Sequence, residues 1–228
     1  MVSSGESHSW SYRGLLISGQ SRDGWKWNLD RSNKFIVKRL SFLIDDKLLA
    51  PCALGRNRSW NNWIPNKVNV AIWRAATNRL PTMACLSSRG VAVSSSVCPL
   101  CESAQECIEH TLCECPLVRS ICLKCWAWWN IPPPPQLTIK DVIFRSLIPS
   151  NCKGVGKALQ GVFYTLMWSI WKWRNKVVHS HPDLKSAARH EDIFPQVQSL
   201  SLLWISNRCN TKSFDWKNWV SNPRGVFS

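Results

Sequence analysis

The feature that most constrains this chain is a cysteine-rich stretch at residues 98 to 115, CPLCESAQECIEHTLCEC. Cys98 and Cys101 form a C-x2-C pair, and His110 and Cys115 complete the pattern C-x2-C-x8-H-x4-C. Thiolates and an imidazole, grouped in two close pairs, match the tetrahedral ligand set that zinc takes in proteins. The spacing therefore predicts a Cys3His zinc site formed by these four side chains.

All four coordination positions of such a site are filled by protein side chains. No position remains for an activated water, so the sequence predicts a structural zinc ion and not a catalytic one. Cys107 and Cys113 lie between the ligands and are alternative ligands, but choosing them would break the regular pair spacing. A further alternative is that these cysteines are buried and bind no metal.

The remaining cysteines are predicted to be thiols. The chain has 11 cysteines, an odd number, and its first residues, MVSSGESHSWSYRGLL, have no basic segment followed by an apolar one. We therefore expect an intracellular protein that is not secreted, with the nucleus as a candidate location. Cys122 and Cys125 form a second C-x2-C pair inside an expected helix, without another pair nearby, and are expected to pack in a core.

Hydrophobic periodicity predicts a mainly α-helical fold with one small β-hairpin. Residues 25–37, WKWNLDRSNKFIV, alternate apolar and polar positions on both sides of a polar turn, which is typical of a hairpin. Apolar residues then recur at three- and four-residue steps in KRLSFLIDDKLL, which indicates a helix.

Helix start and stop residues predict five further helices. Pro81 ends the first, Thr82 caps the second, Gly90 stops it, and Pro116 stands in the first turn of the third. The expected ranges are residues 66–80, 83–89, 117–129, 155–178 and 194–205.

The chain is predicted to contain four regions. Residues 1–24 form a poorly ordered tail, 25–50 the hairpin and its helix, 60–131 the zinc-binding domain, and 136–228 a C-terminal helical region. The four prolines at 132–135 form a stiff, extended boundary between the last two.

The charge of the chain predicts an anionic partner. Its formal net charge is +15, and its pI is about 9.7. Nucleic acid is the first candidate and a membrane surface the second, while the alternative is that the charge only maintains solubility. The longest apolar run, residues 162–171, is far shorter than the roughly 20 residues that span a bilayer, which excludes a transmembrane protein.

Several motifs taken together resemble a known family. They are the stretch WNNWIPNKVNVAIWRAATNRLPTMACLSSRGV, followed by CPLC, by E-x-x-x-H at residues 106–110, and by C-P at 115–116. This order is similar to the zinc-binding domain that follows the polymerase region in plant non-LTR (LINE-type) retrotransposon reverse transcriptases. Trp25–Lys38 and IWKWRN at 170–175 resemble its flanking segments, although Cys113 stands where the family has an aromatic or aliphatic residue.

The resemblance implies a retroelement origin and a zinc module that helps its parent polyprotein handle nucleic acid. It implies no catalysis, because a polymerase palm needs paired acidic residues that hold divalent metal ions. The Asp45–Asp46 pair, in a predicted surface helix, does not have that setting, so reverse transcriptase or ribonuclease H activity is not expected. A protein-interaction or residual fragment without activity remains the alternative.

Basic residues on both sides of the cysteine cluster are the candidate contacts to RNA or single-stranded DNA, with little sequence preference. Tryptophans can stack on unpaired bases, although most of the 15 in this chain are expected to fill the core. The candidate nucleic-acid-binding residues are Lys67, Arg74, Arg79, Arg89, Lys172, Trp173, Arg174 and Lys176.

Overall fold

The computed structural model describes residues 35–37, 40, 60–144, 153–209 and 213–227. The chain divides into two compact units, residues 1–50 and 51–228, which are described separately.

In the first unit, two of the four described residues, Val37 and Leu40, are helical, and none of the four lies in a strand. Val37 lies in a helical turn, and the Leu40 N–H donates to the Ile36 carbonyl at 3.0 Å. This geometry does not support the second strand of the predicted β-hairpin, because a residue whose backbone bonds within its own turn cannot pair along a strand. The rest of that hairpin, the tail at 1–24 and the Asp45–Asp46 pair lie outside the described residues.

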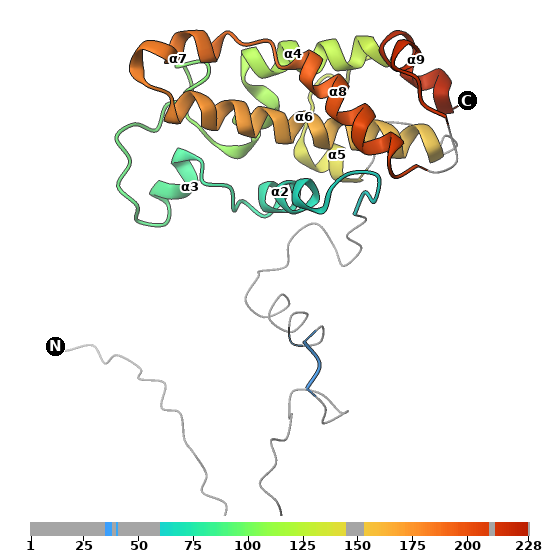
Figure 1. Cartoon of the computed structure of the whole chain (residues 1–228). Helices are drawn as coiled ribbons and strands as arrows, with labels where there is room; N and C mark the ends of the chain where they lie inside the picture. The colour runs from blue at the N-terminus through green and yellow to red at the C-terminus, as the bar shows by residue number, and fades with distance from the viewer. Residues whose placement is uncertain (1–34, 38–39, 41–59, 145–152, 210–212, 228) are drawn as a thin grey trace, which may run out of the picture. The chain divides into compact units, whose positions relative to one another are not determined.

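The second unit is built from helices, as the sequence predicts (Figure 1). They are α2 (Asn66–Ala76), α3 (Met83–Ser87), the π-helix η1 (His110–Glu114), α4 (Pro116–Trp128), α5 (Ile139–Phe144), α6 (Lys153–His179), α7 (Pro182–Arg189), α8 (Phe194–Ser206), α9 (Trp216–Ser221) and the 3-10 helix η2 (Pro223–Phe227). Within the described ranges, β pairing is confined to one isolated bridge between Val97 and Gln105. The short helices α5, α7 and α9 were not predicted.

Local capping explains where several helices begin. The Thr82 hydroxyl accepts the Cys85 N–H at 3.3 Å, and Pro116 is the first residue of α4, both as predicted. At α5, Asp141 Oδ2 accepts the Thr138 N–H at 3.0 Å while Thr138 Oγ1 accepts the Asp141 N–H at 3.2 Å. This reciprocal pair is a capping box, which stabilises a helix too short to be recognised from its periodicity.

Helix α6 is the central element of the second unit. It contacts α2, α5, α7 and α8, and Figure 1 shows these helices around it. Its apolar residues face several directions, and Leu159, Val162, Phe163 and Leu166 are all fully buried. A helix that is apolar on most of its circumference must be covered by neighbours on most sides, and this explains why the other helices surround α6. Among the described helices, none combines the length and apolarity needed to cross a membrane.

The four prolines at 132–135 do not separate two cores. Trp126 in α4 packs against Phe163 in α6 with ring centroids 4.5 Å apart. Trp129 precedes the prolines in the sequence and Trp219 follows them. Their rings nevertheless meet edge to face with centroids 5.9 Å apart, and both side chains are fully buried. Residues from both predicted regions, 60–131 and 136–228, therefore belong to one hydrophobic core.

Candidate metal centre

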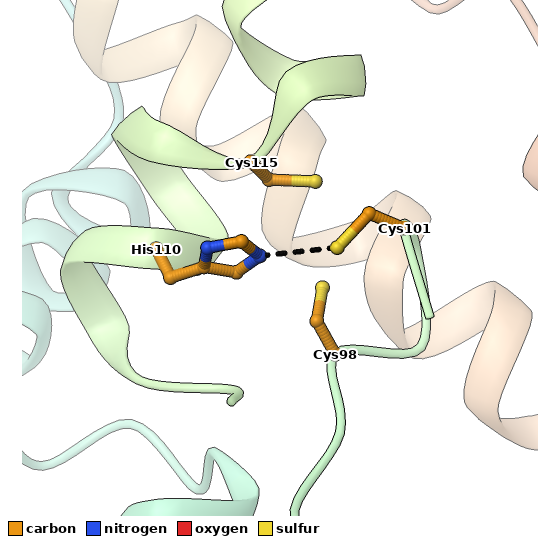
Figure 2. A group of neighbouring side chains, drawn as sticks. All are labelled: Cys98, Cys101, His110 and Cys115. Atoms are coloured by element: carbon orange, nitrogen blue, oxygen red, sulfur yellow. Dashed lines mark hydrogen bonds between the residues drawn. The ribbon is translucent and has the colours of Figure 1, made fainter. Parts of the chain in front are cut away.

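The structure brings the four predicted ligands together. The Sγ atoms of Cys98, Cys101 and Cys115 and a ring nitrogen of His110 all lie within 4.8 Å of one another. Figure 2 shows the four side chains pointing toward a common centre from two segments of the chain. This group could hold one metal ion.

The first ligand pair is positioned by a tight turn. The Cys98 N–H donates to the Ala104 carbonyl at 2.8 Å, and the Glu102 N–H donates to the Cys98 carbonyl at 2.9 Å. Glu102 closes the turn in the left-handed region, with φ of 53°. These bonds hold Cys98 and Cys101 on the same side of the turn, and the Val97–Gln105 bridge closes its base. Residues 97–105 are called the knuckle below.

The second ligand pair is positioned by the π-helix. The Cys115 N–H donates to the His110 carbonyl at 2.8 Å, which is the hydrogen bond between residues five apart that defines a π-turn. Residues five apart then lie one turn apart along the same side. The H-x4-C spacing in the sequence is thus converted into two side chains that face the same point.

Hydrogen bonds among the four side chains shift their pKa values in different directions. A hydrogen bond with Cys115 and burial raise the pKa of Cys98, while the same hydrogen bond lowers the pKa of Cys115. Burial opposes charging of His110, but the hydrogen bond to Cys101 at 3.3 Å, together with the charges of Cys98 and Cys101 and a hydrogen bond to Cys98, raises the pKa of His110 overall. A divalent cation would neutralise the thiolates that these bonds stabilise only in part.

The site is largely buried. Cys98 and Cys115 are 0% exposed and His110 is 7% exposed, while Cys101 is partly exposed. With four protein ligands and little access for substrate, the arrangement suits a structural ion.

Helix α7 is attached to the knuckle by an arginine that the sequence did not single out. Arg189 Nε donates to the Pro99 carbonyl at 3.1 Å, and its Nη2 donates to Glu102 Oε1 at 2.6 Å. The two contacts cross 90 and 87 residues of sequence, so no local pattern could have indicated them. The knuckle is thereby linked to the C-terminal half of the unit.

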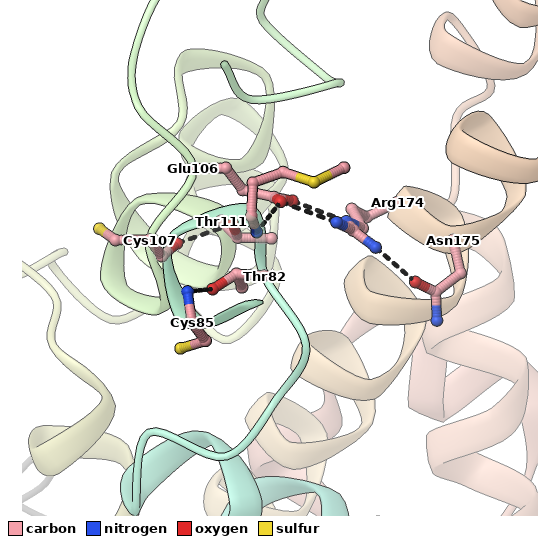
Figure 3. A network of polar contacts seen from close by, with 8 residues as sticks. Thr82, Cys85, Glu106, Cys107, Thr111, Arg174 and Asn175 are labelled. Carbon is pink, nitrogen blue, oxygen red and sulfur yellow. Dashed lines mark hydrogen bonds and ion pairs between the residues drawn. The ribbon is translucent and has the colours of Figure 1, made fainter. Parts of the chain in front are cut away.

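A buried ion pair links the loop between the two ligand pairs to α6 (Figure 3). Arg174 donates to Glu106 twice, from Nε at 2.6 Å and from Nη2 at 2.7 Å, and the Met83 N–H also donates to Glu106 at 2.7 Å. Glu106 is 0% and Arg174 4% exposed. The pair therefore joins the loop between the two ligand pairs to the start of α3 and to the central helix α6.

The other cysteines of this region stand outside the ligand group. Cys107 is exposed, and its Sγ accepts the His110 N–H at 3.4 Å. Cys113, Cys122 and Cys125 are buried, and burial raises the pKa of all three, that of Cys122 to about 12. Such thiols stay neutral, which fits the expected packing role of Cys122 and Cys125.

Six of the predicted nucleic-acid-binding residues lie at the surface. Lys67, Arg74, Arg89, Lys172 and Lys176 are exposed, and Arg79 is partly exposed. Lys176 already binds Glu191, with Nζ 2.7 Å from Oε2.

For Trp173 and Arg174 the prediction must be corrected. Trp173 is 4% exposed and its Nε1 donates to the Ala188 carbonyl of α7 at 2.7 Å. Arg174 is held by Glu106 as described above. Both side chains are enclosed because neighbouring segments cover this face of α6, so neither is available to a ligand at the surface.

Comparison with known proteins supports the domain family. Residues 35–121 match the family model described as zinc-binding in reverse transcriptase, and the match includes all four ligands. No curated protein and no solved structure matches the chain.

We expect the purified chain to bind one divalent metal ion, and Cys98→Ser or His110→Ala to remove it, because each loses one of four ligands. Metal content after dialysis measures this. Cys107→Ser is the matched control, since Cys107 lies in the same loop outside the ligand group and should leave binding intact. Full occupancy in both ligand variants would contradict the assignment.

We expect Arg174→Gln to lower the free energy of unfolding by about 3 to 5 kcal/mol, because it leaves a buried carboxylate without its counter-charge. Denaturant unfolding measures this. Lys176→Gln, two residues further on α6, breaks an exposed pair and should cost no more than about 1 kcal/mol. Equal effects of the two changes would show that burial of the Glu106 pair has no energetic consequence.

Proposed function

We propose that this chain is a zinc-stabilised, retroelement-derived module that binds nucleic acid and has no polymerase activity of its own. The observation that carries the proposal is the closed group of three thiols and one imidazole inside residues that match a zinc-binding reverse transcriptase domain. The flanking motifs further support an origin in a plant LINE-type element.

Zinc is the metal that best suits this donor set. Three thiolates and one imidazole are soft or borderline ligands, which favour zinc over magnesium or calcium. Cys98, Cys101, His110 and Cys115 would hold the ion, which would neutralise charge and pin the knuckle to the start of α4. The residues themselves supply the positioning, through the turn at Glu102 and the π-turn at His110.

Nucleic-acid binding is supported by the charge of the surface. The chain has a formal net charge of +15, and Lys67, Arg74, Arg89 and Lys172 are exposed in the described structure. Exposed cations bind phosphates and release counterions, and this attraction does not depend on base sequence. The proposed partner is therefore RNA or single-stranded DNA, bound with little sequence preference, and not a membrane.

We expect the logarithm of affinity for single-stranded RNA to fall linearly with the logarithm of salt concentration, by roughly 0.7 per phosphate contacted. Fluorescence anisotropy of a labelled oligonucleotide measures the slope. An oligomer with the same bases on an uncharged backbone is the control and should bind much more weakly. Equal affinity for both oligomers, or no binding at low salt, would favour a protein-interaction or residual fragment instead.

We expect no templated DNA synthesis by the pure chain, since the family match covers the zinc-binding part of a reverse transcriptase alone. A primer-extension assay with added Mg²⁺ measures this. Synthesis that disappears on changing Asp45 and Asp46 to Asn would contradict the proposal.

A further inference from the structure

An open depression lies beside the turn that connects α2 to α3. It has a volume of about 580 Å³ and is lined by Trp73, Arg74, Thr77, Asn78, Arg79 and Arg89. Half of the lining residues are arginines and none is acidic. These six residues are called the arginine depression below.

The arginines are held around the depression by the chain itself. Arg74 Nη2 donates to the Arg79 carbonyl at 3.3 Å, and Arg89 Nη2 donates to the Asn78 carbonyl at 3.1 Å. The Arg79 guanidinium lies 5.5 Å from the centre of the Trp73 ring. Each contact restricts a long side chain before any ligand arrives, which lowers the entropic cost of binding.

The turn that carries these contacts is also fixed. Asn78 is in the left-handed region, with φ of 57°. The buried Cys85 thiol donates to Asn78, with Sγ 3.2 Å from Oδ1 and 3.6 Å from the carbonyl oxygen. The depression is therefore a built feature of the α2–α3 connection.

The three positive charges are not compensated within the described structure. Some other surface cations there have carboxylate partners, such as Arg189 with Glu102 and Lys176 with Glu191. Arg74, Arg79 and Arg89 make no ion pair with any described carboxylate. Three guanidinium groups around one hollow repel one another, and an anion placed among them would remove that repulsion.

Further cations extend from the depression along α2. Lys67 lies seven residues before Arg74, which places both on the same face of the helix about 10 Å apart. Lys172 of α6 is near Lys67, since burial and then the Lys67 charge lower its pKa. A chain of anions bound in the depression could thus continue past both lysines.

We infer that the arginine depression binds backbone phosphates of a single-stranded nucleic acid, an inference that rests on the proposed function and specifies its site. Arginine binds phosphate through paired N–H groups, which suits it better than lysine to this role. The volume lies in the usual range for small-ligand sites, about 300 to 1,000 Å³, so a phosphate and its sugar have room. Asn78 adds a polar group beside the arginines, and the Thr77 hydroxyl, which donates to the Trp73 carbonyl at 2.8 Å, can accept a hydrogen bond from a sugar hydroxyl. Phosphate contacts carry no base specificity.

The test compares two triple variants that lose the same charge. Arg74, Arg79 and Arg89 are changed to Gln in one, and Arg119, Arg208 and Lys217 in the other. The control residues are exposed and make no ion pair with a described carboxylate. Affinity for a labelled single-stranded RNA is measured over a range of salt concentrations, with metal content and circular dichroism as checks on folding.

We expect the depression variant to lose at least tenfold in affinity at low salt and its salt slope to become shallower by about 2. The control variant should lose less than threefold. Equal losses would show that binding follows diffuse charge, which overturns the site while the proposed function stands. No binding by the unmodified chain would instead overturn the proposed function, and the site with it.

A third variant covers the case in which glutamine impairs folding. Changing Arg74, Arg79 and Arg89 to Lys keeps the charge and removes the paired donor geometry. Affinity should fall several-fold while the salt slope stays the same. Unchanged affinity in this variant would show that the arginine geometry has no role.

Discussion

The buried pair between Glu106 and Arg174 joins the candidate metal centre to the central helix of the second unit. Two charges with 0% and 4% exposure are tolerated only if each satisfies the other, and the Met83 N–H satisfies Glu106 further. Glu106 lies between the two ligand pairs, and Arg174 lies on the central helix. This contact therefore fixes the loop between the two ligand pairs on α6.

The metal centre and the ion pair support each other. The knuckle presents Cys98 and Cys101 before Glu106, and the π-turn presents His110 and Cys115 after it. A bound ion would join the two ends of the loop that contains Glu106. Arg189 would connect the knuckle, ordered in this way, to α7. The ion would then have a structural role, holding the knuckle and α7 in place. The exposed cations of the α2–α3 connection are not part of the ligand group.

Sequence reasoning succeeded where the information is local. Each successful prediction depends on residues close together in the sequence. These are the spacing of the ligands, the Thr82 cap and Pro116 at the start of α4. It failed for Trp173 and Arg174, because their positions in a basic, aromatic segment do not reveal that α7 and a loop 68 residues away cover them. The motif residues Glu106 and Arg174 were both noticed, but their pairing is visible only in three dimensions. Helices of six or eight residues, such as α5, α7 and α9, are too short for periodicity to indicate.

We propose that a metal ion and the Glu106–Arg174 pair together hold the knuckle on α6, and that α6 is stable through its own packing. Amide hydrogen exchange before and after removal of metal by a chelator tests it most directly. We predict that residues 97–119 and α7 lose protection while residues 162–171 of α6 keep theirs. Unchanged protection in the knuckle, or an equal loss in α6, would contradict it.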